Sequence, residues 1–166
     1  VRALQASPTS LNFFPIKGPH RILGYPDASF KNNADKSSQR ALTIFSASER
    51  TKSPDSFGSL IQYESAKIKR TTLSTTVAEL YAIMKCFGTC QFLRGLWMDL
   101  TGEHAPIHLR TDANNLVNTA SSTQLPEQQD TIHMIQMLRK EANSGVIDDI
   151  AHVRTAFCLA DCLTKS

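Results

Sequence analysis

Several features are missing from this sequence, and each absence narrows what the protein can be. No apolar run is long enough to span a bilayer, and no charged-then-apolar leader opens the chain. We therefore expect no membrane partner and no secretion, but an intracellular location in a cytoplasmic particle or the nucleus. Neither an internal repeat nor a low-complexity tract appears. The net charge is only +3, so a nucleic-acid-binding surface would have to be a local patch.

Cysteine is scarce, with Cys86, Cys90, Cys158 and Cys162 only, and none of them forms a C-x-x-C pair. Each of the two pairs is four residues apart, which on a helix places both thiols on one face. We expect small buried hydrophobic side chains, reduced and metal-free, in a reducing compartment. A cysteine-rich metal site spanning two helices is the alternative, although the usual ligand spacing is absent.

What is present describes one globular domain. The 166 residues suit a single domain, and 41% hydrophobic with 20% charged residues is an ordinary globular mixture. Residues 1–20 contain three prolines and a glycine and are interpreted as a lead-in segment, with the domain itself over 21–166. The first residue is Val1 rather than Met, which suggests a piece of something longer.

The first part of the domain has the pattern of three short strands. Apolar or alternating stretches cover 22–29, 40–49 and 59–69, and short polar links separate them. Such spacing predicts an antiparallel meander.

The period then changes to that of a helix. Apolar residues recur at helical spacing from Thr75 to about Leu100, where Ser74 or Thr75 can cap the start and Gly102 can end the helix. The remaining elements are expected as a strand running into a helix over 105–122, a helix after Pro126, a strand over 145–153 and a short closing helix over 156–165. This order predicts an α/β fold with a five-stranded mixed sheet, three antiparallel strands then two parallel ones, flanked by helices.

Four acids occupy informative places in this plan. Asp27 and Asp112 end apolar strands, Glu79 lies in the first turns of the long helix, and Asp161 lies in the closing helix. Carboxylates that converge in apolar surroundings repel one another unless a cation lies between them. Hard oxygen ligands favour Mg²⁺ or Mn²⁺, and two such ions about 3.5–4 Å apart can activate a water for attack on a phosphodiester.

Each acid also has an ordinary structural explanation. Asp27 and Asp112 could be turn or helix-cap residues, Glu79 could favour the positive end of a helix, and Asp161 could be an exposed helical acid. The hypothesis of a metal site depends on all four acids arriving in this order on this pattern of elements.

Four segments carry a resemblance to a known family. GYPDAS, LSTTVAELYA, IHLRTDANNLV and HVRTAFCLADCLTKS resemble, in this order, motifs of the ribonuclease H domain that ends the polyprotein of copia-type retrotransposons. VRALQASPTSL resembles the segment that ends the reverse transcriptase part of such polyproteins. The resemblance covers nearly the whole chain.

The resemblance implies an activity and a set of partners. It implies an endonuclease that hydrolyses the RNA strand of an RNA/DNA hybrid, using two Mg²⁺ ions with Mn²⁺ as a substitute, held by Asp27, Glu79, Asp112 and Asp161. Its partners would be the hybrid and a covalently linked reverse transcriptase domain, with no small-molecule substrate. Positions that it implies in nucleic-acid binding are Ser29 for the hybrid backbone, Ser74 for a DNA-strand phosphate, and Thr76 and Asn114 for the minor-groove side.

The sequence departs from the family in three ways. Pro26 precedes the first acid, so a strand there must tolerate a missing N–H donor. The loop histidine that aids product release in cellular ribonucleases H is absent, and the nearby His152 is interpreted as a strand residue. The basic handle helix of some cellular members is also missing, and we expect Lys67, Lys69 and Arg70 to contact phosphate in its place, unless they are only a solvated strand end.

Two alternative functions remain open from the sequence. A degraded or co-opted ribonuclease H-like domain could bind nucleic acid or act as a scaffold with little or no catalysis. A transposase or integrase core would have the same fold, but the early helical Glu79 and the LADCLTK ending argue against it.

Overall fold

The computed structural model describes residues 13, 15, 16, 18–48, 58–122 and 129–165. Most of the lead-in expected over 1–20 lies outside these residues, so its link to a preceding domain stays a prediction. Within the part of the chain that is described, no helix has both the length and the apolar character needed to cross a membrane.

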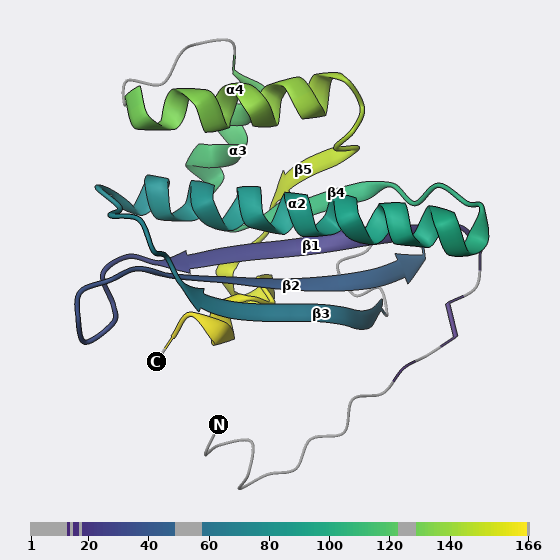
Figure 1. Cartoon of the computed structure of the whole chain (residues 1–166), viewed down its shortest axis with the longest axis horizontal. Coiled ribbons are helices and arrows are strands. Elements are labelled where there is room, and N and C mark those ends of the chain that lie inside the picture. The colour runs from purple at the N-terminus through teal and green to yellow at the C-terminus, as the bar shows by residue number, and fades with distance from the viewer. Residues whose placement is uncertain (1–12, 14, 17, 49–57, 123–128, 166) are drawn as a thin grey trace, which may run out of the picture.

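The core of the molecule is one mixed sheet of five strands (Figure 1). Its order is β3-β2-β1-β4-β5, with β1–β3 antiparallel and with β4 parallel both to β1 and to β5. This confirms the predicted fold class. The strands are β1 His20–Ser29, β2 Gln39–Ser48, β3 Gly58–Lys67, β4 Ile107–Thr111 and β5 Asp149–His152.

The last strand begins later than predicted from the sequence. Gly145, with a φ of +73°, turns the chain after α4 (Gln129–Asn143), as a left-handed residue does at a helix end. The N–H groups of Val146 and Ile147 then donate to the carbonyl of Glu141 at 2.9 and 3.0 Å. Because these amides close the helix, they cannot take part in a strand ladder.

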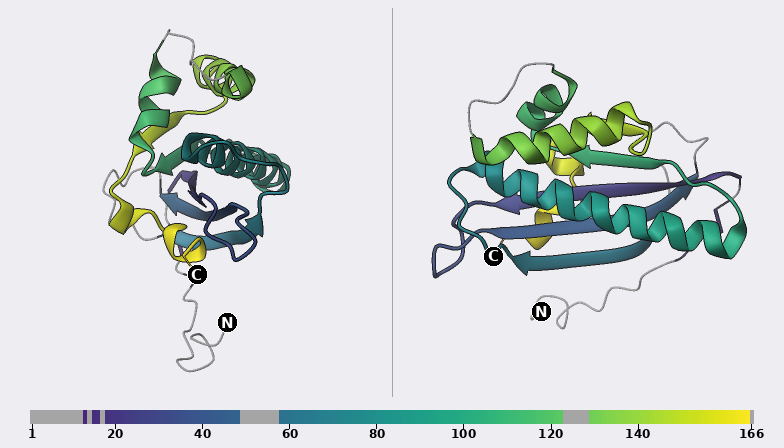
Figure 2. Two further views of the ribbon diagram at one scale, coloured as in Figure 1. Left: turned by 90° about the vertical axis from the view of Figure 1, so that its left-hand side faces the viewer. Right: turned by 45° about the horizontal axis from the view of Figure 1, so that its top comes forward.

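Helix α2 (Thr75–Thr101) covers one face of the sheet, and α3 (Asn114–Ser121) and α4 lie further out (Figures 1 and 2). Both predicted caps of α2 are present. The Ser74 side chain accepts from the Val77 N–H at 3.3 Å, and the Gly102 N–H donates to Met98 O at 2.8 Å. The hydrophobic core between α2 and the sheet includes Leu42, Ile44, Leu80, Ile83, Phe87, Ile107 and Leu109.

The predicted closing helix over 156–165 is wrong. The segment instead forms two 3₁₀ turns, η1 Thr155–Phe157 and η2 Asp161–Leu163, on the side of the sheet away from α2 (Figure 2). Packing of Cys158 and Ala160 against Ala41 of β2 holds the segment in this tight form. Cys158 and Cys162 therefore share no helix face: one is buried and the other exposed.

The other cysteine pair behaves as the spacing predicts. Cys86 and Cys90 are both fully buried on one face of α2, and all four thiols are unbridged. Their sulfur atoms pack against Gly24 of β1, where an added Cβ would lie 2.7 and 2.9 Å from them. Glycine is required here because any side chain would collide with both thiols.

The sheet accommodates Pro26 because the pairing of β1 with β4 ends before it. The last pair of this parallel ladder is Gly24 with Leu109. Beyond it, no β4 residue needs an N–H donor from β1. Asp27 and Asp112 each lie three residues past this last pair, so the parallel register carries both to the same place.

Candidate active site

Asp27 and Asp112 meet at the end of the sheet where β1 and β4 finish. One carboxylate oxygen of each, together with Cys158 Sγ, lies within 4.8 Å of the other two ligand atoms. Asp27 is buried and Asp112 is half-buried. Two carboxylates at this separation repel each other when both are charged, so the pair is a candidate cation site.

Asp27 is tied to the C-terminal segment by a hydrogen bond. The Thr164 hydroxyl donates to its Oδ2. Burial raises the pKa of Asp27; the Thr164 bond opposes this rise, and the charges of Asp112 and Asp161 add to it. One donor thus orients the carboxylate, but burial and the neighbouring negative charges still disfavour its charged form.

Glu79 of α2 is a buried acid near Asp27 and Asp112. It is 8% exposed, and its Oε2 is buried without a hydrogen-bond partner among the described residues. Burial raises its pKa to about 8, with further contributions from the charges of Asp27 and Asp112, against a bond from the Ala28 N–H. A buried carboxylate oxygen without a donor costs free energy unless it has a partner such as a cation.

Asp161 lies close to the cluster, but its carboxylate forms an ion pair with Lys165. Its charge raises the pKa of Asp27, while its own Oδ2 pairs with Lys165 Nζ at 2.5 Å. The hydrogen bond to Asp161 is the main reason why the pKa of Lys165 is raised. The negative charges of Asp27 and Asp112 raise it further. In this structure the Lys165 ammonium group provides the countercharge for Asp161.

The donors present fit a hard divalent cation. Asp27 and Asp112 supply carboxylate oxygens from β1 and from just after β4, and Glu79 of α2 lies near enough for the charges of both to act on it. A cation here would neutralise the mutual repulsion and give Glu79 Oε2 its missing partner. The catalytic role of the four acids stays a prediction.

One of the residues expected at the nucleic acid, Thr76, makes a contact between helices. The Thr76 hydroxyl accepts from Asn115 Nδ2 at 3.1 Å, which joins α2 to α3, while Asn114 is exposed at the start of α3. Ser74 caps α2 next to Thr76.

Ser29 differs from the expectation. Its Oγ is buried and has no hydrogen-bond partner in the part of the chain that the structure describes. As placed, this hydroxyl is not presented at the surface to a hybrid backbone.

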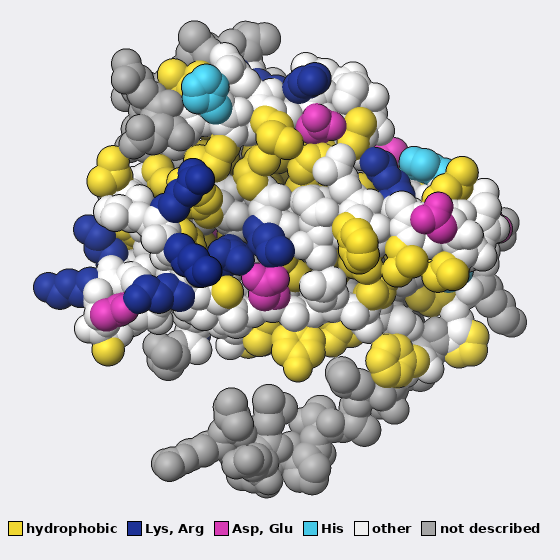
Figure 3. Space-filling view, in the orientation of Figure 1, with side chains coloured by type: hydrophobic (Ala, Val, Ile, Leu, Met, Phe, Trp, Pro, Cys, Tyr) yellow, Lys and Arg dark blue, Asp and Glu magenta, His cyan; other side chains and the backbone are white. Residues whose placement is uncertain are grey.

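Basic side chains gather over the end of β3 and the start of α2 (Figure 3). We call them the basic patch: Lys36, Arg40, Lys67, Lys69, Arg70 and Lys85, which line two adjoining surface pockets. Arg40 and Lys85 pair with Glu64 at 2.8 and 3.6 Å. Lys69 and Arg70 are exposed and make no ion pair with any described residue.

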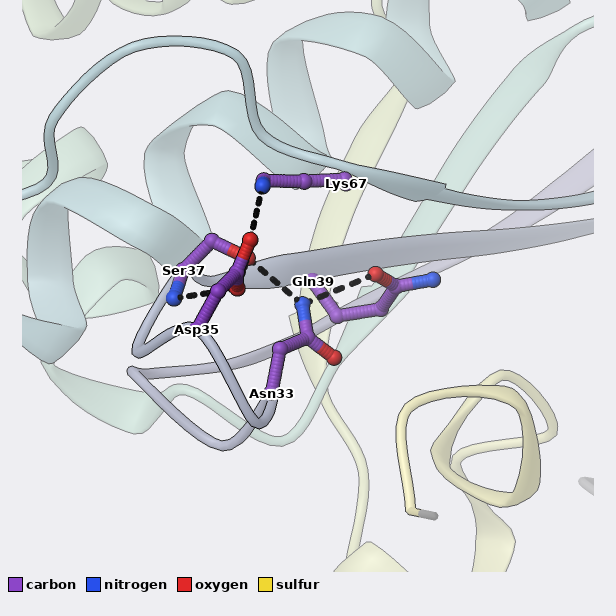
Figure 4. A network of polar contacts seen from close by, with 5 residues as sticks. All are labelled: Asn33, Asp35, Ser37, Gln39 and Lys67. Atoms are coloured by element: carbon purple, nitrogen blue, oxygen red, sulfur yellow. Dashed lines mark hydrogen bonds and ion pairs between the residues drawn. The ribbon is translucent and has the colours of Figure 1, made fainter.

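Lys67 belongs to a separate small network at the β1–β2 turn (Figure 4). It pairs with Asp35, which also accepts from the N–H and, at 2.6 Å, from the hydroxyl of Ser37. These three donors lower the pKa of Asp35, with Lys67 contributing most. Of the three cations expected at phosphate, Lys67 is therefore committed to the turn, whereas Lys69 and Arg70 are available.

His152 is an exposed residue at the end of β5, in register with Thr111 of β4. It lies in a strand, as the sequence indicates. Its partner Thr111 immediately precedes Asp112 in the chain.

Sequence reasoning missed four residues at the site: Cys158, Thr164, Lys165 and Asn115. The resemblance of LADCLTK to a family motif was a signal for Thr164 and Lys165, since both lie in that motif. No sequence signal pointed to Cys158, because its position depends on the 3₁₀ turns that replaced the predicted helix.

Comparison with known proteins rests on structure alone. No family model matches the sequence, and no curated protein does. Among solved structures, the chain resembles the ribonuclease H1 LC11 isolated from compost, in complex with an RNA/DNA hybrid, with a TM-score of 0.61 and 16% identity over 86% of this chain and 93% of that one. Ribonuclease H1 of Halobacterium salinarum gives a TM-score of 0.56 and 18% identity over 86% and 93%.

The chain has the ribonuclease H fold. A third similar structure is the foamy viral protease-reverse transcriptase in complex with an RNA/DNA hybrid, with a TM-score of 0.55 and 13% identity over 95% of this chain and 21% of that one. The ribonuclease H fold thus occurs both as a separate enzyme and as part of a larger polypeptide. Identities this low establish the architecture only.

Proposed function

We propose that the chain is a hybrid-specific endoribonuclease, the ribonuclease H domain of a copia-type retrotransposon polyprotein in which a reverse transcriptase domain precedes it. The observation that carries the proposal is Glu79. Its buried Oε2 has no hydrogen-bond partner among the described residues, and the charges of Asp27 and Asp112 act on it, which is costly unless the site binds cations. The sequence motifs around each acid supply the family assignment.

Asp27, Asp112 and Glu79 would hold two Mg²⁺ ions, or Mn²⁺ in their place, with Asp161 completing the set. Bound cations of this kind supply an activated water and stabilise the leaving oxygen of a phosphodiester. Thr164 orients Asp27 through its hydrogen bond, and Ala28 N–H orients Glu79. Lys165 must release Asp161 for that carboxylate to turn toward the other three.

The surface beside the acids supports a hybrid as substrate. Lys69 and Arg70 precede α2 as unpaired cations that suit the phosphates of one strand, with the Ser74 hydroxyl close by in sequence. Asn114 is exposed at the start of α3, only two residues after Asp112, where it can reach a 2′-hydroxyl or a minor-groove edge. A ribonuclease H1 of this fold has been solved with an RNA/DNA hybrid, which is consistent with this substrate.

One observation favours the second candidate, a hybrid-binding domain without cleavage. The Lys165 ammonium pairs with the Asp161 carboxylate at 2.5 Å. Because the chain itself supplies this countercharge, Asp161 needs a metal ion less. The two candidates share the basic patch and differ only in chemistry.

The test is cleavage of an end-labelled RNA/DNA hybrid, single-stranded RNA and duplex DNA by the 166-residue chain, with Mg²⁺ and Mn²⁺ side by side. We expect cuts in the RNA strand of the hybrid only. Asp27→Asn and Glu79→Gln should abolish cleavage and leave hybrid binding measurable. Asp99→Asn and Glu103→Gln are matched controls, since both acids are exposed and lie at the far end of α2, and they should cleave normally.

A second readout does not depend on activity. Millimolar Mg²⁺ or Mn²⁺ should raise the melting temperature of the wild type, because a ligand that binds only the folded state stabilises it. Asp112→Asn should lose most of this gain. Metal-loaded protein that binds the hybrid and leaves it uncut would favour the second candidate.

A further inference from the structure

The acid cluster contains one ligand that a magnesium enzyme does not need. Cys158 Sγ lies within 4.8 Å of a carboxylate oxygen of both Asp27 and Asp112. The side chain is 4% exposed, so the thiol is not a surface group that happens to be nearby. Its neighbours on the 3₁₀ segment, Ala160 and Leu163, pack against the sheet and hold it in place.

Thiol and carboxylate ligands together select a different class of metal from carboxylates alone. Mg²⁺ binds oxygen and rarely sulfur, whereas Zn²⁺ and Cd²⁺ favour a thiolate. Ligands on one tetrahedral zinc ion, at bond lengths of about 2.0–2.3 Å, lie roughly 3.5 Å apart. From the 4.8 Å within which they lie, the three ligand atoms need to close by about 1.3 Å at most to reach that spacing.

A second observation at the same place also points to a ligand. Glu79 Oε2 is buried, has no partner among the described residues, and belongs to a side chain that is only 8% exposed. The charges of Asp27 and Asp112 act on Glu79, so α2 places a further buried negative charge beside the three ligand atoms, which favours a cation there.

We propose that Cys158, Asp27 and Asp112 form a binding site for one thiophilic divalent cation, Zn²⁺ or Cd²⁺, beside the buried carboxylate of Glu79, and that this ion excludes the cations needed for hydrolysis. When the sulfur–metal bond forms, the thiol proton passes to the buffer. The binding itself does not require that the domain be a nuclease; the exclusion of catalytic cations rests on the proposed function.

Binding is tested with Cd²⁺ alone on the metal-free 166-residue chain, in a phosphine reductant that does not bind the metal. Titration should produce an ultraviolet thiolate-to-cadmium band that saturates at one ion per chain. Cys158→Ser should remove the band and weaken Cd²⁺ binding by at least about tenfold. A band of the same intensity in Cys158→Ser would overturn the proposal, since it would place the ion at another thiol.

Two further variants keep the test decisive. Cys162→Ser is the matched control: this thiol is exposed and four residues away, and the band should persist. Asp112→Asn retains the Cys158 thiol and should still weaken Cd²⁺ binding by about tenfold, because one of the proposed ligands is lost. Unchanged Cd²⁺ affinity in Asp112→Asn would overturn the proposal even if Cys158→Ser failed to fold.

Competition is tested with micromolar Zn²⁺ added to hybrid cleavage in millimolar Mg²⁺. For each protein we compare the rate with Zn²⁺ against its own rate without it. We expect a loss of about tenfold or more in the wild type and in Cys162→Ser, and a much smaller loss in Cys158→Ser. Equal zinc sensitivity in all three overturns the proposal. Absence of cleavage in Mg²⁺ alone contradicts the proposed function, while the Cd²⁺ band still decides the binding site.

Discussion

Helix α2 contains, about two turns apart, a stretch packed for stability around Phe87 and a stretch around Glu79 that faces other carboxylates. Phe87, Cys86 and Cys90 are fully buried against apolar strands and against Gly24. Glu79 is nearly as buried, yet its Oε2 has no described partner and its pKa is raised to about 8. The same helix therefore contributes favourable packing at one position and an unfavourable charge at another, as expected where stability is sacrificed for binding.

The largest effect on stability is expected when a large side chain is removed from the packed stretch around Phe87. Phe87→Ala should lower the free energy of unfolding by about 3–5 kcal/mol, since it removes the largest fully buried side chain. Urea denaturation followed by circular dichroism measures this loss. Phe92→Ala is the control on the same helix: Phe92 is 69% exposed, so its removal should change the stability by less than about 0.5 kcal/mol. Equal losses in both variants would contradict the assigned core.

The opposite change adds a side chain where α2 packs closely against β1, at Gly24. Gly24→Ala should cost about 1–3 kcal/mol, because the new Cβ would lie 2.7 Å from Cys86 Sγ and 3.0 Å from Leu109 Cδ2. Gly88→Ala is the counterpart, since a Cβ there meets nothing within 4 Å, and it should stabilise the helix by up to about 1 kcal/mol. A loss of stability in Gly88→Ala would show that α2 is more crowded there than described.

At the charged stretch, neutralisation should stabilise the metal-free protein. The pKa of Glu79 rises from its ordinary 4.5 to about 8 on folding. The folded protein thus holds this proton more tightly than the unfolded chain, so stability falls as pH rises from about 4.5 to about 8 and the penalty is complete above that. Glu79→Gln should gain several kcal/mol, at most about 5, at pH 8.5 and nothing at pH 4.

Thermal denaturation across this pH range in a chelator measures the effect. Glu103→Gln, on an exposed acid beyond the end of α2, should follow the wild-type curve. Adding Mg²⁺ should then reverse the order of wild type and Glu79→Gln at pH 8.5. A Glu79→Gln curve parallel to the wild type at all pH values would contradict the buried carboxylate.

The smallest effect is expected at the N-terminal cap of α2, before both stretches. Ser74→Ala should cost about 1 kcal/mol, because the Val77 N–H loses its acceptor at the start of α2. If Ser74 also contacts a DNA-strand phosphate, hybrid affinity should fall by more than the cleavage rate at saturating hybrid. Ser74→Thr keeps the hydroxyl and should restore both. Loss of stability without loss of hybrid affinity would leave Ser74 with the capping role alone.

Local pattern was sufficient for most elements of the fold. The alternating strands, the helical period of α2 and the residues at its caps depend on neighbours close in the chain, so Ser74 and Gly102 could be recognised without a structure. The closing segment, expected as a helix over 156–165, forms two 3₁₀ turns instead. Over so short a stretch, packing of Cys158 and Ala160 on Ala41 outweighs the local preference for a helix.

The chain's own sequence determined which side chains are available: four acids, each at the end or beginning of an element, and cations next to the start of α2. Only the tertiary structure decided which of them meet. The parallel register of β1 and β4 brings Asp27 to Asp112, and the 3₁₀ segment places Cys158 beside both. The reason is physical: spacing along a chain sets the face of an element, but contacts between residues that are far apart in the chain depend on how whole elements pack.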